Sequence, residues 1–181
     1  TPGPRARQPW FFERVSCCPP NLARLLAQLP GYFYGTNEEG LWVHMYAANE
    51  LDWQFDDGMP ARLRVATRYP WGGKVEIEVE PEREREFSLF LRIPGWCQHA
   101  TISINGQAVS VTPHRGYAEL RRRWSPSDSV VLELPMRPEA LVADPRVVEA
   151  RDSVALKRGP LVYCLESVDN PGLALRDVEL Q

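Results

Sequence analysis

The fold of this chain is decided by an alternating stretch, Lys74-Val75-Glu76-Ile77-Glu78-Val79-Glu80. Apolar residues at every second position indicate a β-strand with one buried face, because successive side chains point to opposite sides of a strand. Residues 87–93 repeat this period, and we expect Phe87, Leu89, Leu91 and Ile93 on the buried face. The mixed charges of residues 81–86, between the two stretches, predict a solvated connection.

Other short stretches of the same kind follow on both sides, at residues 41–46, 63–69, 100–104, 117–120, 130–134 and 161–165. Asn105-Gly106 predicts a tight hairpin, since both residues adopt positive φ at little cost. Many short strands at such intervals predict a mainly β fold, an antiparallel β-sandwich of the jelly-roll type. Residues 134–146 contain three prolines and are expected to be a connector. Residues 155–166 predict either one more strand pair or the start of another module.

The composition and charge of the chain argue against two classes of partner. The 181 residues carry 21 basic and 24 acidic side chains, for a formal net charge of -3, so neither nucleic acid nor an anionic membrane is expected to bind. No apolar run approaches the roughly 20 residues that span a bilayer, and the segment from Thr1 to Arg7 lacks a signal-peptide core. We expect a cytoplasmic protein, and a start without Met suggests the interior of a longer gene product.

The adjacent thiols Cys17 and Cys18 precede Pro19-Pro20 and a helical apolar stripe, Leu22, Leu25, Leu26 and Leu29. Proline is tolerated in a first helical turn, so the pair is expected at the N-terminus of a helix. Negative charge is favoured there, and a thiol should ionise more easily than in a free cysteine. A thiolate is both a nucleophile and a zinc ligand. The alternative is that both side chains pack beneath the helix.

The remaining candidates have plainer interpretations. Cys97 and Cys164 are expected to be buried packing residues, and the separated His44, His99 and His114 to be structural or superficial. Arg121-Arg122-Arg123 cannot form one patch, because alternate strand residues face opposite ways. Aromatic rings can stack on sugars as well as fill a core. Trp71, beside Gly72-Gly73, is the best exposed candidate, whereas Trp42, Trp53 and Trp96 are expected in the core.

Several motifs together carry a family resemblance. They are Ser16-Cys17-Cys18-Pro19-Pro20-Asn21, Leu91-Arg92-Ile93-Pro94-Gly95-Trp96-Cys97, Ile104-Asn105-Gly106, Leu132-Glu133-Leu134-Pro135-Met136 and Lys157-Arg158-Gly159-Pro160-Leu161-Val162-Tyr163. In this order they resemble glycoside hydrolase family 127, the β-L-arabinofuranosidases. The resemblance implies an (α/α)6 barrel followed by β-sandwich domains. Residues 1–30 would then be a short helical remnant of the barrel with the cysteine pair, 31–140 the β-sandwich, and 141–181 further strands of it or a second β module.

The resemblance also implies roles for the cysteine pair. Cys17 matches the nucleophile of a retaining mechanism, and Cys17 and Cys18 both match zinc ligands. A third cysteine and a glutamate that complete the zinc site, and the glutamate that acts as acid/base, would lie upstream of this chain. By this interpretation the chain is the C-terminal portion of a zinc-dependent glycosidase acting on β-L-arabinofuranosides or related glycans, and is inactive alone.

A second hypothesis makes the sandwich a non-catalytic carbohydrate-binding or structural module. Under either one, the expected partners are a carbohydrate and the missing N-terminal barrel, and a homo-oligomer stays open. A thiol redox switch is disfavoured, because a disulfide between adjacent residues is strained and no Cys-x-x-Cys spacing occurs.

Overall fold

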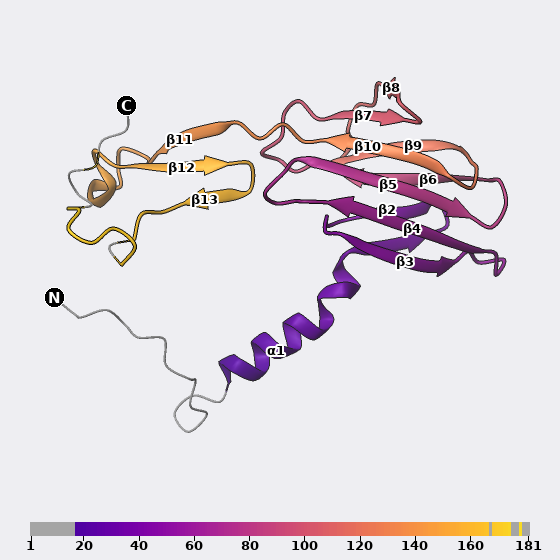
Figure 1. The fold of residues 1–181 in the computed structure, drawn as a ribbon, viewed down its shortest axis with the longest axis horizontal. Helices are drawn as coiled ribbons and strands as arrows, with labels where there is room; N and C mark the ends of the chain where they lie inside the picture. Colours follow the sequence, from indigo (N-terminus) through magenta and orange to yellow (C-terminus); the bar gives the residue numbers. More distant parts are fainter. Residues whose placement is uncertain (1–16, 167, 175–177, 179–181) are drawn as a thin grey trace.

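The computed structural model describes residues 17–166, 168–174 and 178; the predictions made for Thr1 to Ser16 lie outside these ranges. The elements are shown in Figure 1. In chain order they are α1 (Cys18–Gln28), the 3-10 helix η1 (Leu29–Tyr32), β1 (Tyr34–Asn37), β2 (Gly40–Val43), β3 (Asn49–Gln54), β4 (Pro60–Thr67), β5 (Lys74–Pro81), β6 (Arg85–Arg92), β7 (Thr101–Ile104), β8 (Gln107–Val109), β9 (Tyr117–Trp124), β10 (Asp128–Glu133), β11 (Pro138–Val142), the 3-10 helix η2 (Val148–Ala150), β12 (Val154–Arg158) and β13 (Leu161–Tyr163). The predicted mainly β fold is confirmed.

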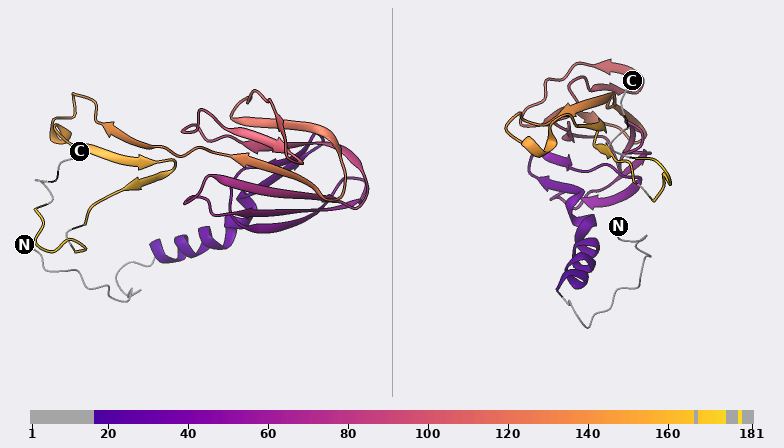
Figure 2. Two further views of the ribbon diagram at one scale, coloured as in Figure 1. Left: turned by 45° about the horizontal axis from the view of Figure 1, so that its top comes forward. Right: turned by 90° about the vertical axis from the view of Figure 1, so that its left-hand side faces the viewer.

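Two sheets form the body of the protein. One has the strand order β1-β2-β6-β9 and the other β3-β4-β5-β10-β7-β8, and Figure 2 shows them as two layers. All pairings are antiparallel except β2 with β6, which run parallel. Side chains from both sheets meet in a single core that includes Leu41, Leu89, Leu63, Ile77 and Leu132.

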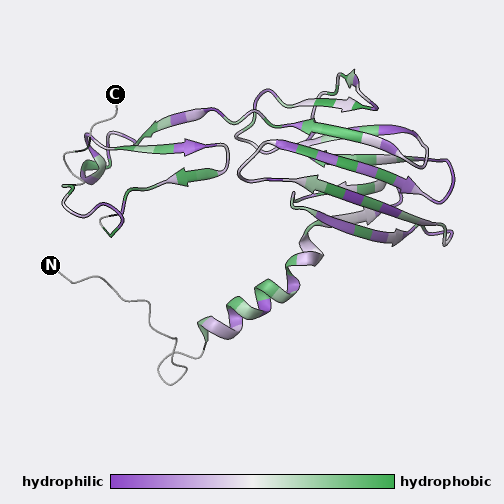
Figure 3. Ribbon diagram, viewed as in Figure 1, coloured by the Kyte–Doolittle hydropathy of each residue, from purple (hydrophilic) through white to green (hydrophobic). Residues whose placement is uncertain are grey.

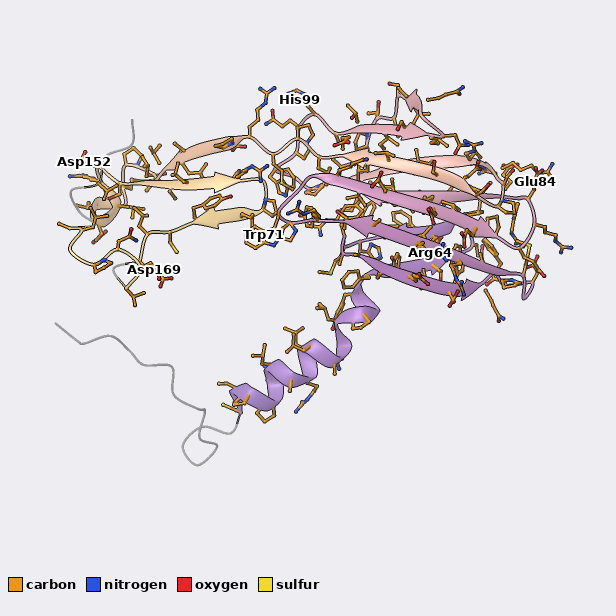
Figure 4. The ribbon with its side chains drawn as sticks, viewed as in Figure 1. Arg64, Trp71, Glu84, His99, Asp152 and Asp169 are labelled. Atoms are coloured by element: carbon orange, nitrogen blue, oxygen red, sulfur yellow. The ribbon has the colours of Figure 1, made fainter. Side chains whose placement is uncertain are left out.

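The alternating stretch behaves as predicted. Val75, Ile77 and Val79 in β5 are fully buried, while the glutamates between them face outward. The outward face of the same layer carries the ion pairs of Arg64, whose guanidinium contacts Glu50 and Glu78 at 3.0 and 3.1 Å. Figure 4 labels Arg64 on this face. Such exposed pairs stabilise little, so the buried face determines the register.

Strand β6 differs from the prediction, because it is buried on both faces. Phe87, Leu89 and Leu91 point into the core, but Ser88 and Phe90 on the opposite face are also buried. The Trp42 ring covers that face by stacking on Phe90, with a centroid separation of 3.8 Å and an interplanar angle of 5°. Trp42 is therefore a cover on the outer face of the sheet rather than a core residue.

The other tryptophans show why ring burial is hard to predict. Trp53 and Trp96 are partly buried and pack against the core, whereas Trp124 is fully buried. Trp124 donates its indole N–H to the Phe87 carbonyl at 3.0 Å, which satisfies its polar group in the interior. Trp71 is 67% exposed, as predicted.

The predicted hairpin at Asn105-Gly106 is confirmed. Both residues have positive φ, 51° and 77°, and they join β7 to β8. The Asn105 amide donates to the nearly buried Asp128 carboxylate at 2.7 Å, and Asp128 in turn accepts the Ser125 backbone N–H at 2.9 Å. These contacts tie the hairpin to the start of β10.

Residues 134–146 are not the connector that the prolines suggested. They contain β11, because Pro138 begins the strand and so removes no interior ladder donor. Strands β11, β12 and β13 form a separate antiparallel sheet, in which residues 154–158 and 161–163 make the predicted strand pair. Its faces are poorly covered: Val142 is 78% and Val162 is 68% exposed. None of the helices in the described ranges is long and apolar enough to cross a membrane.

The third sheet meets the two-sheet body near Trp71 (Figure 4). Arg158 donates from its guanidinium to the Trp71 carbonyl at 3.0 Å. The backbone of the neighbouring Gly73 lies against that of Leu134, whose N–H donates to the Gly73 carbonyl at 2.9 Å. A Cβ added to Gly73 would lie 2.0 Å from the Leu134 carbonyl oxygen. This position therefore has no room for a side chain.

Replacing Gly73 by alanine is expected to lower the free energy of unfolding by about 2–3 kcal/mol, because the backbone of residue 134 must move away. Gly72→Ala is the matched control, since a Cβ there would meet only the Arg68 Cβ at 3.7 Å. It should change stability by less than about 0.5 kcal/mol. Denaturant unfolding of both variants measures the difference, and equal stabilities would refute the steric argument.

Candidate functional site

The two predicted site cysteines lie at the start of α1. Cys17 is the residue before the helix, with helical φ and ψ of -75° and -40°, and Cys18 is its first residue. Both thiols are free and exposed, and their Sγ atoms lie 3.5 Å apart. This is too long for a disulfide, whose S–S bond is about 2.05 Å. The alternative that the pair packs beneath the helix is wrong.

The two prolines shape the chemistry of this helix start. Pro19 and Pro20 have no N–H, so the first helical hydrogen bond runs from the Asn21 N–H to the Cys17 carbonyl at 3.3 Å. An ordinary helix leaves its first four N–H groups unpaired, and here two of them do not exist. The helix N-terminus therefore offers few free N–H donors to the two cysteine side chains.

The apolar stripe of α1 is not covered by the described sheets. Leu22, Leu25 and Leu26 are 57%, 51% and 60% exposed, and the helix extends away from the body (Figure 3). The helix is present but does not pack on the sandwich. An amphipathic helix of this kind gains stability by burying its stripe against another surface.

The other two cysteines have contrasting surroundings. Cys97 is buried as predicted, and burial raises the pKa of its thiol, which keeps it protonated and unreactive. Cys164 was expected to be buried as well, but it follows β13 and is exposed. The apolar residues around it belong to the uncovered third sheet, where an apolar run does not produce a core. Neither thiol lies next to the Cys17-Cys18 pair in sequence.

The histidines do not form a site. His44 shares a 2.7 Å hydrogen bond between its Nδ1 and the Tyr117 hydroxyl, and burial, helped by the nearby Arg92 charge, lowers the pKa of its imidazole. This is the structural role that the sequence indicated. In the ranges that the structure describes, no group of three or more His, Cys, Asp or Glu residues could hold a metal ion.

Two family models match consecutive parts of the chain. The model of the β-L-arabinofuranosidase GH127 middle domain matches residues 40–136, and that of the glycoside hydrolase family 127 C-terminal domain matches residues 138–181. Together they cover the two-sheet body from β2 onward and the third sheet.

Longer relatives of this chain belong to the same family as the matching models. A non-reducing end β-L-arabinofuranosidase of Bifidobacterium longum is 36% identical over 172 residues, covering 92% of this chain and 25% of the relative. A crystal structure of a GH127 β-L-arabinofuranosidase from Geobacillus stearothermophilus superposes with a TM-score of 0.82 at 45% identity, over 91% of this chain and 26% of that one. A further GH127 β-arabinofuranosidase gives a TM-score of 0.81 at 31% identity, over 93% of this chain and 29% of that one.

The chain spans about a quarter of the length of the curated relative, and the relatives are glycoside hydrolases. Its fold, its motifs and both family models agree on one assignment. The chain belongs to glycoside hydrolase family 127 and corresponds to a C-terminal portion of the family's proteins.

Proposed function

We propose that this chain is the C-terminal part of a zinc-dependent retaining glycosidase, with Cys17 as its nucleophile, that acts on β-L-arabinofuranosides or related glycans. The observation that carries the proposal is the exposed Cys17-Cys18 pair, with free thiols 3.5 Å apart, in a chain of this family. The named relatives are β-L-arabinofuranosidases, which supports the substrate class.

The spacing of the thiols fits one zinc ion. Zinc binds thiolates at about 2.3 Å in a tetrahedron, which places two sulfur ligands about 3.8 Å apart. The Sγ separation of 3.5 Å needs only a small adjustment to reach that value. Cys17 and Cys18 would hold the ion, and the remaining ligands would come from the preceding part of the protein. When bound, zinc would keep the thiols deprotonated and moderate the charge on sulfur.

The reaction would then proceed in two displacements. In the first, the Cys17 thiolate attacks the anomeric carbon, the glycosidic C–O bond breaks, and a carboxylic acid from the preceding domain protonates the leaving oxygen. In the second, water attacks the same carbon and loses its proton to that carboxylate, while the C–S bond breaks and the thiolate is restored. Two inversions retain the anomeric configuration.

The exposed stripe of α1 supports a place for this helix inside a larger helical domain. Leu22, Leu25 and Leu26 would be buried there, which would also fix the position of the adjacent Cys17. We expect that domain to be the barrel implied by the sequence resemblance. A nucleophile must be held close to the ideal attack geometry, and an unsupported helix cannot achieve this.

The isolated 181-residue chain is expected to show no measurable hydrolysis of an aryl β-L-arabinofuranoside, with or without added zinc. Two zinc ligands and the acid/base are not among its residues under this proposal, and acid catalysis alone contributes about 10²–10⁴-fold. The whole enzyme, assayed in parallel with zinc, is the positive control and should hydrolyse the substrate. Activity of the isolated chain would contradict the placement of the acid/base upstream, whereas an inactive whole enzyme would contradict the proposed reaction.

A further inference from the structure

A pocket of about 300 Å³ opens at the end of the two-sheet body remote from the third sheet. We call it the rim pocket. It is formed by the β1–β2 turn, the end of β3 with the residues after it, and the start of β6. Glu84, labelled at this end of the body in Figure 4, marks the neighbouring β5–β6 turn. The lining residues are Thr36, Asn37, Glu38, Glu39, Gly40, Trp53, Gln54, Phe55, Asp56, Arg85, Glu86 and Phe87.

Three aromatic rings form one side of the rim pocket. Phe55 lies 5.1 Å from Phe87 and 5.7 Å from Trp53, centroid to centroid, in edge-to-face contacts. Phe87 is buried, while Trp53 and Phe55 are only partly buried. The sequence suggested a core role for Trp53, and alternation alone could not show that its strand ends beside a cavity. Partly exposed aromatic rings held by a rigid cluster suit the apolar C–H face of a sugar.

The polar side of the pocket is already organised. Asn37 holds the β1–β2 turn, because its side-chain amide oxygen Oδ1 accepts the backbone N–H groups of Glu39 and Gly40 at 3.1 and 3.2 Å. The Arg85 guanidinium lies 4.1 Å from the Phe55 ring centroid and pairs with Asp57. A site whose walls are fixed before binding loses less entropy when a ligand arrives.

Gln54 and Asp56 add hydrogen-bonding groups to the lining, and both residues are exposed. Gln54 makes no side-chain hydrogen bond among the described residues. An amide and a carboxylate beside an aromatic wall are suitable partners for the hydroxyl groups of a sugar, since the amide can donate to or accept from a hydroxyl and the carboxylate accepts from one.

The charge of the lining restricts the ligand. The lining contains one guanidinium, that of Arg85, which pairs with Asp57. It also contains four carboxylates, of which Glu86 pairs with Arg121 at 3.2 Å: Glu38, Glu39, Asp56 and Glu86. Such a surface repels uronic acids and phosphorylated sugars, but it accepts neutral ones. A volume of about 300 Å³ is at the lower end of ligand sites and suits one or two sugar units.

We propose that the rim pocket is a binding site for a neutral glycan, separate in sequence from the Cys17-Cys18 pair. Trp53 and Gln54 also border a second, shallower hollow over β3 and β4, lined by Asp52, Ala61 and Arg62 among others. A glycan chain longer than two units can continue across the edge of β3 into it. The inference goes beyond the proposed hydrolysis and does not depend on it, because a non-catalytic site can hold a polymer near an enzyme.

The test is a titration of the 181-residue chain with methyl β-L-arabinofuranoside, followed through tryptophan fluorescence and the indole N–H signals in NMR spectra. A saturable shift of the Trp53 signal is expected, and galacturonate should produce none. Gln54→Ala should weaken binding about fivefold, the loss typical of one hydrogen bond. Asp56→Ala, which removes the other exposed polar group of the lining, should act in the same direction.

Gln107→Ala is the matched control. Gln107 is also an exposed glutamine on an edge strand, β8, at the opposite edge of the same sheet. It should bind the sugar as the unmodified chain does. The proposal is overturned if no saturable shift is seen, if galacturonate binds equally, or if Gln54→Ala and Gln107→Ala have the same affinity. Loss of binding in Trp71→Ala, with Gln54→Ala unaffected, would place the sugar at Trp71 instead.

Discussion

Cys17→Ser in the whole enzyme is expected to lower kcat/KM for an aryl β-L-arabinofuranoside by at least about a thousandfold. A serine hydroxyl has a far higher pKa than a thiol and is a much poorer ligand for zinc, so the variant loses both the nucleophile and one proposed metal contact. Steady-state kinetics with zinc present measure the loss, and the zinc content of the purified variant shows how much of it comes from the metal.

The matched control is Cys164→Ser, which replaces another free, exposed cysteine, directly after β13. It should retain full activity. Cys18→Ser should lower the zinc content, since Cys18 is proposed as a ligand but not as the attacking group. If the Cys17→Ser enzyme stays within tenfold of the unmodified one, Cys17 is not the nucleophile, whatever the metal content.

Trp124→Ala is expected to lower the free energy of unfolding by about 3–5 kcal/mol. The side chain is fully buried, its ring lies 5.8 Å from that of Phe87, and its N–H donates to the Phe87 carbonyl at 3.0 Å. Removing it leaves a cavity in the core and loses this hydrogen bond. Chemical denaturation followed by far-UV circular dichroism provides the measurement.

Trp71→Ala is the matched substitution at the surface. The Trp71 side chain is 67% exposed, and its contact with Arg158 uses the backbone carbonyl, which alanine retains. The change should be within about 0.5 kcal/mol. If Trp124→Ala does not fold, Trp124→Phe keeps most of the ring and should lose only about 1–2 kcal/mol, mainly from the missing hydrogen bond. A Trp124 variant as stable as the Trp71 variant would contradict the core assignment.

Local patterns were sufficient for most of the strands. Val75, Ile77 and Val79 alternate with charged residues, and that period alone identifies β5 and its buried face. Asn105 and Gly106 predict their hairpin because the required backbone conformation is a property of those two residues. The helix at Cys18–Gln28 follows in the same way from the two prolines and the leucine spacing.

Predictions were wrong where a residue depends on partners far along the chain. Phe90 is buried because Trp42, on the parallel neighbour β2, stacks on it. Cys164 is exposed because it follows β13, whose sheet has no covering layer among the described residues. Pro138 suggested a connector, yet it begins a strand. Burial and pairing of this kind are set by long-range contacts, which a local window does not contain.

The features of the candidate sites also separate into those set by local sequence and those set by tertiary packing. The sequence by itself determined the β fold, the family and the identity of the thiol pair, because these depend on residue types and short spacings. The tertiary structure decided that the two Sγ atoms are exposed and 3.5 Å apart, that α1 presents an uncovered apolar stripe, and that three separate segments meet to form the rim pocket. The physical reason is that side-chain alternation is a local consequence of backbone geometry, whereas a pocket exists only after distant segments have packed together.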